Sequence, residues 1–131
     1  MSCRFLNLAA ALAAAALLGA CASDYSFSQL YGTRYHRATI DTYPLVVSKV
    51  DGRSTPLATP VLTEPGQRTV VVQTLPDPTH RFGVERSLQL AVEPCTRYYL
   101  VAVKSTRLAR DYEVKVDHEE PIAGCTAPAK S

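Results

Sequence analysis

The sequence predicts an all-β protein: a small antiparallel β-sandwich of five to seven strands that follows an N-terminal helical segment and a flexible tether. After residue 21, no stretch shows the apolar period of a helix of ordinary length. Short runs rich in Val, Leu and Tyr recur instead, several with alternating apolar and polar residues. Proline and glycine separate these runs, which is typical of a sandwich, with a small barrel as the alternative.

The first twenty residues form a segment of their own. The run 5–18 is apolar except for Asn7, and Arg4 places a positive charge in front of it. Its fourteen residues are fewer than the roughly 20 that a membrane-spanning helix needs. A charged start, a short apolar run and a small-residue end are typical of a secretory signal peptide. We therefore expect residues 1–20 to be a signal helix that is removed.

The end of this segment, Leu18-Gly19-Ala20-Cys21, resembles the lipobox of bacterial lipoproteins. In that family the chain is cut before the cysteine, whose thiol receives a diacylglycerol and whose amine receives a further acyl chain such as palmitate. The resemblance implies lipidation of Cys21 and stable attachment to a membrane, since two or more acyl chains suffice for this. Ala22 is not the Asp that retains proteobacterial lipoproteins at the inner membrane. The resemblance therefore implies the outer membrane, with the domain facing the periplasm; an ordinary secretory signal is the alternative.

Removal of residues 1–20 leaves 111 residues, which is the length of one domain. Arg4 is lost with the signal, so 13 basic residues remain against 12 acidic ones and the net charge is near +1. Because a nucleic-acid binder would need a clustered basic face, we do not expect nucleic-acid binding.

Two cysteines remain for the folded domain. Cys3 is removed with the signal and Cys21 carries lipid, which leaves Cys95 and Cys125. In an oxidising compartment such a pair predicts a disulfide. A reactive thiol or a metal-binding pair is the alternative, although the sequence has no CxxC motif.

Residues 21–38 predict the lipidated cysteine and a tether with little regular structure, because no apolar period is sustained there. The β domain is then expected at residues 39–131. One hypothesis for the tether is that its aromatic and basic side chains rest on lipid headgroups. We favour the alternative, in which the later tyrosines pack on the β domain as its first edge. These side chains are Tyr25, Tyr31, Tyr35, Arg34, His36 and Arg37.

The first strands follow from local signals. Residues 45–50 are a β-branched run ended by Asp51-Gly52, which predicts a strand entering a turn. Residues 53–62 contain Pro and Thr and permit only short extended pieces. Glu64-Pro65-Gly66-Gln67 predicts a type II turn. The run 68–75 after it predicts a central strand with Val70 and Val72 on one face.

The second half of the domain alternates more clearly. Residues 84–92 predict a strand, but Arg86 interrupts its apolar face, so we expect the strand to begin at Ser87. Residues 97–104 are apolar on both faces, which indicates a central strand that forms an antiparallel hairpin with 84–92. After a polar connection, residues 111–117 predict a last strand. Its inward side chains would be Tyr112, Val114 and Val116, and the disulfide would hold the tail 119–125 near the turn 93–96.

The order of these elements resembles small bacterial envelope domains of the immunoglobulin-like or transthyretin-like type. The matching segments are Glu64-Pro65-Gly66 and residues 69–72, 88–90 and 98–102. The resemblance implies a β-sandwich and names no activity.

No enzyme motif is present: the chain lacks Gly-x-Ser-x-Gly, His-Glu-x-x-His and a phosphate-binding glycine loop. On an extended chain the neighbouring side chains of His118, Glu119 and Glu120 would point apart, so they predict a solvated acidic stretch rather than a metal site. We therefore expect no catalytic residue, no metal and no cofactor. Tyr99 is expected to pack in the core or against a neighbouring strand; the alternative is that it lines a ligand groove.

Loops on a rigid scaffold concentrate binding residues. The loop 76–83 is accordingly the predicted binding loop, with Asp77, His80, Arg81 and Phe82 as its candidates.

We expect a non-enzymatic lipoprotein that acts as a structural or interaction module and binds another protein of the cell envelope. One alternative is a module that binds a small ligand or a glycan such as peptidoglycan; exposed aromatic side chains beside a charged pair would favour it. The other is an accessory subunit of a secretion or efflux machine.

Overall fold

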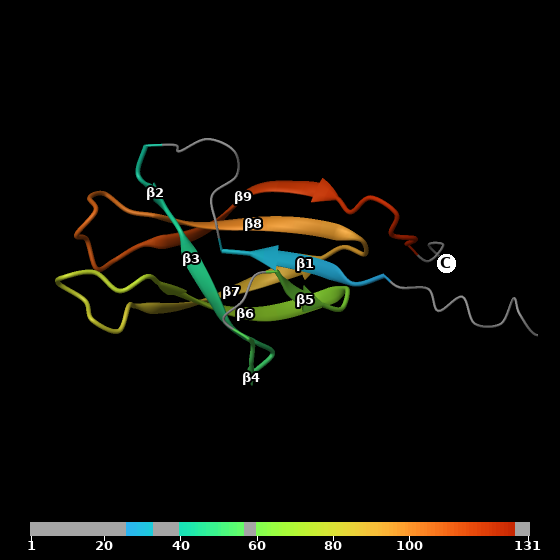
Figure 1. The fold of residues 1–131 in the computed structure, drawn as a ribbon, viewed down its shortest axis with the longest axis horizontal. Helices are drawn as coiled ribbons and strands as arrows, with labels where there is room; N and C mark the ends of the chain where they lie inside the picture. Colours follow the sequence, from blue (N-terminus) through green and yellow to red (C-terminus); the bar gives the residue numbers. More distant parts are fainter. Residues whose placement is uncertain (1–25, 33–39, 57–59, 128–131) are drawn as a thin grey trace, which may run out of the picture.

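The computed structural model describes residues 26–32, 40–56 and 60–127. These residues form two β-sheets that face each other (Figure 1), which confirms the predicted all-β sandwich. Within these ranges no helix is long and apolar enough to cross a lipid bilayer. The predicted signal helix and Cys21 lie outside the described residues.

The described residues form nine strands, more than the five to seven expected, because several strands are only two to four residues long. They are β1 (Ser28–Tyr31), β2 (Thr42–Tyr43), β3 (Leu45–Val50), β4 (Arg53–Ser54), β5 (Val61–Thr63), β6 (Gly66–Thr74), β7 (Glu85–Val92), β8 (Thr96–Val103) and β9 (Glu113–Pro121).

One sheet is built around β8. Strand β9 pairs with one edge of β8, while β1 and β2 share its other edge, and β5 lies beyond β1. Strand β1 runs parallel to β8, and the other pairs among the described strands are antiparallel. The second sheet has the order β4-β3-β6-β7. The central positions predicted for β6 and β8 are confirmed.

The core lies between the two sheets. Val70 and Val72 of β6 are fully buried, as their alternation predicted, and they face Leu30 of β1 and Leu100 of β8 in one apolar cluster. Removing this apolar surface from water is the main stabilising contribution to the fold. The turn predicted at Asp51-Gly52 joins β3 to β4, and both residues have positive φ, +49° and +79°.

The predicted tether contains a strand of the sandwich. Ser28 and Leu30 of β1 are fully buried, and β1 lies between β8 and β5. The boundary expected at residue 39 is therefore wrong, since the β domain includes residues 28–31. Sequence alternation did not reveal β1, because Leu30 is its only inward-facing apolar residue. The packing favoured for Tyr31 is present, but on an interior strand; Tyr25 and Tyr35 lie outside the described residues.

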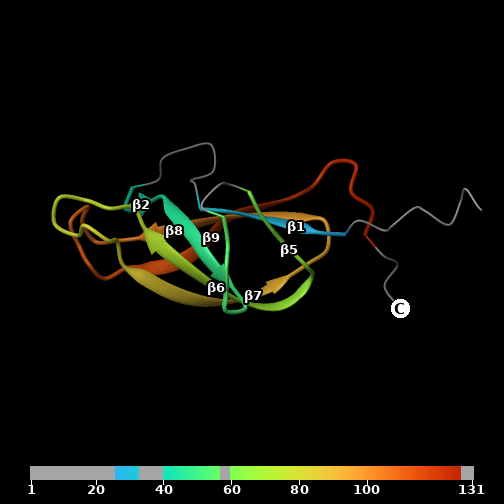
Figure 2. The ribbon, with the colours of Figure 1, turned by 60° about the horizontal axis from the view of Figure 1, so that its bottom comes forward.

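The hairpin predicted between β7 and β8 is wrong. Strand β7 pairs with β6 in one sheet, and β8 pairs with β1, β2 and β9 in the other. The turn at Glu93–Cys95 carries the chain across from one sheet to the other (Figure 2). Cys95 has a φ of +55°, and the Tyr98 hydroxyl accepts a hydrogen bond from the Glu93 N–H at 2.9 Å. This hydrogen bond links the residue that follows β7 to a side chain of β8, so it ties the two sheets together at the crossing.

Two strand boundaries also differ from expectation. Strand β7 begins at Glu85 rather than Ser87, because Arg86 reaches past the core, stacks over the Tyr112 ring and forms an ion pair with Asp111. Strand β9 continues to Pro121, with Asp117 as an extra residue between the pairs of Val116 and His118. This bulge lies in the strand, and Val116 is exposed although inward orientation was expected.

Candidate functional site

The predicted binding loop connects β6 to β7, and two of its four candidate residues stabilise the loop itself. Asp77 Oδ1 accepts hydrogen bonds from the backbone N–H groups of Thr79 and His80, both at 2.7 Å. Asp77 Oδ2 lies 3.2 Å from His80 Nδ1. Burial raises the pKa of the Asp77 carboxyl, but the hydrogen bonds from His80 and Thr79 outweigh it and hold that pKa below its ordinary value. Asp77 is thus a turn-forming residue.

The other two candidates, Arg81 and Phe82, are exposed. Phe82 keeps 85% of its surface accessible, and its carbonyl oxygen accepts a hydrogen bond from the Gln73 side chain. The four predicted residues therefore do not form one site. Asp77 and His80 shape the loop, and the loop presents Arg81 and Phe82 to solvent.

The β6–β7 loop and the β8–β9 loop lie at the same end of the sandwich (Figures 1 and 2). The Tyr112 hydroxyl donates a hydrogen bond to the Val84 carbonyl oxygen at 2.5 Å and so links the two loops. Strand β2 pairs with the last residues of β8 at this end. We call this end, formed by residues 40–43, 75–84 and 104–112, the distal end.

Exposed apolar side chains gather at the distal end. Four of the six large hydrophobic residues that are exposed in the described part of the chain belong to it: Ile40, Leu75, Phe82 and Leu108. Single exposed apolar residues are normal, but a group of them indicates an interaction surface. The same segments carry Arg81, Arg107 and Arg110, for which no ion-pair partner occurs among the described residues. The distal end is therefore both apolar and basic.

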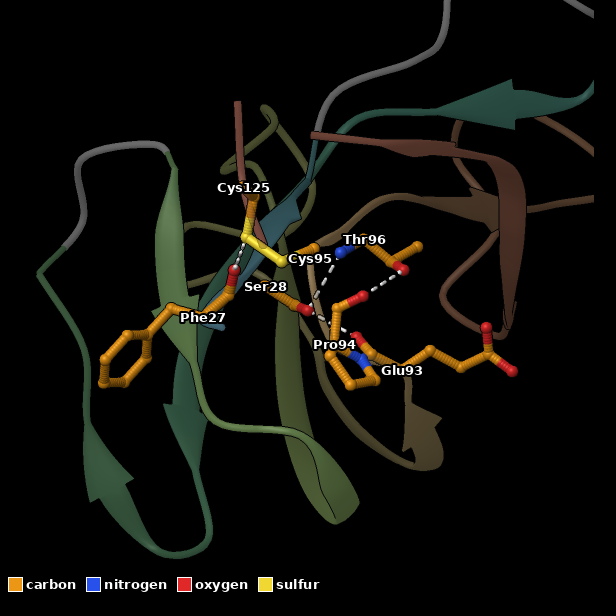
Figure 3. The surroundings of a disulfide bond; sticks show 7 residues. All are labelled: Phe27, Ser28, Glu93, Pro94, Cys95, Thr96 and Cys125. Carbon is orange, nitrogen blue, oxygen red and sulfur yellow. Dashed lines mark hydrogen bonds between the residues drawn. A yellow bond between two sulfur atoms is a disulfide. The ribbon is translucent and has the colours of Figure 1, made fainter. Parts of the chain in front are cut away.

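The opposite end is closed by the Cys95–Cys125 disulfide, which the structure contains as predicted (Figure 3). The fully buried Ser28 hydroxyl accepts a hydrogen bond from the Thr96 N–H at 3.1 Å and donates one to the Glu93 carbonyl oxygen. The described chain begins here, since the Cys95 N–H donates to the Ser26 carbonyl oxygen at 3.3 Å. We call this the disulfide end.

The outer face of the β8 sheet carries a polar cluster whose residues no sequence motif connects. Arg97 Nη1 lies 2.7 Å from Glu120 Oε1, and the Tyr99 hydroxyl donates to the same oxygen at 2.9 Å. Arg97 Nε donates to Gln29 Oε1 at 2.9 Å. The Tyr31 and Tyr99 rings stack with centroids 5.2 Å apart. Tyr98 faces the core and Tyr99 the outer face, so a core position for Tyr99 is wrong, while the expected packing across strands is present as its stack on Tyr31.

Each charge in this cluster is stabilised by its neighbours. The hydrogen bonds from Tyr99 and from Arg97 lower the pKa of the Glu120 carboxyl. The hydrogen bonds to Tyr99 and to Glu120 raise the pKa of the Arg97 guanidinium. Burial and the hydrogen bond to Glu120 raise the pKa of the Tyr99 hydroxyl. Glu120 is thus part of a hydrogen-bonded cluster rather than a freely solvated acidic stretch.

No group of three or more His, Cys, Asp or Glu side chains suited to a metal ion occurs among residues 26–32, 40–56 and 60–127. Comparison with known proteins gives no match: no family model fits the chain, and neither a curated protein nor a solved structure is significantly similar to it. The surfaces of the molecule are therefore the basis for assigning a function.

Proposed function

We propose that this protein is a non-enzymatic lipoprotein of the outer membrane, facing the periplasm, whose distal end binds another envelope protein. One observation carries the proposal: exposed apolar side chains, and arginines with no ion-pair partner in the described ranges, gather at the end of the sandwich opposite to the disulfide end. The lipobox-like Leu18-Gly19-Ala20-Cys21 supports the membrane attachment. Small sandwich lipoproteins of secretion or efflux machines would be one setting for such a module.

The position of the chain's start supports this orientation. Ser26 is hydrogen bonded at the disulfide end, and it follows Cys21 by only five positions in the sequence. Even fully extended, five residues span at most about 18 Å. A lipid on Cys21 would therefore hold the disulfide end close to the membrane. The distal end, about 25 Å away along an eight-residue strand, would face the periplasm.

The chemistry of the distal end defines its partner. Phe82, Ile40 and Leu108 would form an apolar centre, and aromatic side chains are favoured in such centres. Arg81, Arg107 and Arg110 would lie around them and attract a surface with excess carboxylates, which speeds and orients encounter. We therefore expect a protein partner with an apolar patch bordered by acidic residues.

Site-specific cross-linking in intact cells tests the partner surface. A photoactivatable residue at position 82 is expected to give one stoichiometric cross-linked protein. The same residue at position 62 serves as the matched control, because Leu62 is also exposed, at 52%, but lies on β5 away from the distal end. Recovery of the lipoprotein alone from position 82, or of the same protein equally from both positions, would contradict the proposal.

Replacing the lipidated cysteine tests the anchor. The Cys21→Ser variant is expected to leave the membrane fraction and appear as soluble, folded protein, because it cannot receive the diacylglycerol. The measurement is fractionation followed by circular dichroism of the soluble protein. Full retention of Cys21→Ser in the membrane fraction would show that another feature anchors the chain.

Glycan binding is the second candidate function, and one observation favours it. The outer face of the β8 sheet places the Tyr31–Tyr99 stack beside the Arg97–Glu120 ion pair, which are groups that suit sugar rings and hydroxyls. Sedimentation with purified peptidoglycan tests this candidate. It predicts that Tyr99→Ala reduces co-sedimentation and that Phe82→Ala does not, whereas the first proposal predicts no co-sedimentation of either variant or of the unmodified chain.

A further inference from the structure

A cavity opens at the distal end between β2, the β6–β7 loop and the β8–β9 loop. Its volume is about 340 Å³, and its wall includes Tyr43, Leu75, Pro76, Asp77, Lys104 and Arg107. Pockets that hold small ligands begin at about this size, 300 Å³. The cavity is therefore large enough for a small molecule and combines apolar with charged groups.

Lys104 is the unusual residue of this wall. Only 7% of its surface is exposed, and its Nζ lies 5.5 Å from the centre of the Tyr43 ring. In the described part of the chain no carboxylate lies within ion-pair distance of this ammonium group. The described residues contain no fully buried side-chain nitrogen or oxygen that lacks a hydrogen-bond partner, so the tip of the Lys104 ammonium keeps contact with water while its stem is buried. The Tyr43 ring adds a cation–π contact, and the ammonium group remains available to a ligand.

The rest of the wall leaves an excess of positive charge. Asp77 is the only carboxylate among the lining residues, and its oxygens are engaged by the N–H groups of Thr79 and His80 and by the His80 ring. Arg107 is a second cation with no ion-pair partner in the described ranges. Two cations and one engaged carboxylate give the wall a net charge of +1, which a singly charged anion would balance.

We propose that this cavity binds a small carboxylate that carries an apolar body. The carboxylate would lie between the Lys104 ammonium and the Arg107 guanidinium, whose planar fork suits a carboxylate. The apolar body would lie against Tyr43, Leu75 and Pro76. A doubly charged phosphate fits less well, because it exceeds the net charge of the wall and has no apolar part. The inference is independent of the proposed partner, since a small ligand can bind whether or not a protein covers the distal end.

Calorimetric titration of the purified full chain with butyrate tests the proposal, with 1-butanol and inorganic phosphate as comparison ligands. Butyrate is expected to bind saturably and more tightly than either comparison ligand, because only butyrate combines one negative charge with an apolar chain. The Lys104→Met variant is expected to bind butyrate about tenfold more weakly or worse, since it loses a charge-assisted hydrogen bond. Its melting temperature without ligand should change little, because methionine fills similar space to the buried stem of Lys104.

Two arginine variants complete the experiment. Arg107→Ala should weaken butyrate binding, whereas Arg110→Ala should leave it unchanged, because Arg110 is in the same loop but does not line the cavity. If Lys104→Met fails to fold, the difference in butyrate affinity between Arg107→Ala and Arg110→Ala decides alone, since both side chains are exposed. The proposal is overturned by absent butyrate binding, by equal affinity for 1-butanol or tighter affinity for phosphate, or by equal effects of the two arginine variants.

Discussion

Glu120 illustrates how a single side chain on an edge strand can contribute to the fold. It is the penultimate residue of β9, where a solvated carboxylate was expected. Instead, one of its oxygens contacts both the Arg97 guanidinium and the Tyr99 hydroxyl. Because these contacts favour the charged form, the pKa of Glu120 lies below its ordinary value of 4.5. The ionised carboxylate is therefore more stable in the folded chain than in the unfolded chain.

This difference predicts a pH-dependent effect of Glu120→Gln. A group whose folded pKa is lowered stabilises the fold above its unfolded pKa and loses this effect as pH falls through its folded pKa. The variant should therefore melt at a lower temperature than the unmodified chain at pH 7, and the gap should narrow below about pH 4.5. Thermal melts monitored by circular dichroism from pH 7 to pH 2.5 measure it.

Glu119→Gln is the matched control for this experiment. Glu119 is the exposed neighbour on the same strand. The difference in melting temperature between Glu119→Gln and the unmodified chain should change less across the same pH series than the difference for Glu120→Gln. A gap for Glu120→Gln that stays constant down to pH 2.5 would contradict a stabilising role of the charged form.

The sequence could not reveal this cluster because its members come from three strands. Gln29 and Arg97 are separated by 68 residues, and Arg97 and Glu120 by 23. Only the parallel pairing of β1 with β8 brings the first pair together. Asp77 and His80 illustrate the opposite error. Their types and loop position suggested binding, but a carboxylate three residues before a histidine also forms a turn, and local spacing does not distinguish the two roles.

At the scale of the element, β1 shows what alternation can and cannot predict. Strands β3 and β6 were predicted because runs of β-branched residues lie beside turn signals, and in β6 these residues also alternate between two faces. Strand β1 has only four residues, and its inward positions are Ser28 and Leu30. Ser28 is buried because its hydroxyl is hydrogen bonded to Glu93 and Thr96, which are far away in the sequence. The sequence also does not show whether a turn returns to the same sheet, as in the incorrect β7–β8 hairpin.

The burial of β1 predicts a large effect of Leu30→Ala. Leu30 is fully buried in the cluster between the sheets, so removing its side chain leaves a cavity. Core Leu→Ala substitutions cost about 2–5 kcal/mol, and urea unfolding monitored by circular dichroism measures the free energy of unfolding. Leu62→Ala is the matched control, since Leu62 pairs with Gln29 across β1 and β5 but is half exposed. A loss for Leu30→Ala no greater than for Leu62→Ala would mean that β1 is not part of the core.

At the scale of the whole molecule, the sandwich has two ends with different stabilising contacts. The disulfide end is closed by the Cys95–Cys125 bond, by the buried Ser28 hydroxyl and by the Ile122 N–H, which donates to the Cys95 carbonyl oxygen at 2.8 Å. The distal end is held by local hydrogen bonds in its loops and by the Tyr112–Val84 contact. The covalent bond therefore fixes the end near the predicted lipid, while the end with exposed apolar groups depends on noncovalent contacts.

The separation of the two ends predicts both a global and a local result for the double variant Cys95→Ala/Cys125→Ala. The bond closes a loop of 30 residues, for which chain entropy gives a stabilisation of about 3–4 kcal/mol. Urea unfolding should show a loss of this size. Hydrogen exchange should accelerate at the Thr96 and Ile122 amides, whose partners Ser28 and Cys95 lie at the disulfide end.

The distal end supplies the internal control of the same experiment. The Val84 amide donates to Thr74 Oγ1 at 2.9 Å, and its contacts do not involve the tail. In the variant, its protection from exchange should therefore fall only by as much as the lower global stability requires. The measurement is amide exchange under native conditions, where local openings are resolved from global unfolding. Equal additional loss of protection at Val84 and at Ile122 would contradict the two-end description, since it would mean that the disulfide stabilises the distal loops as directly as the tail that it closes.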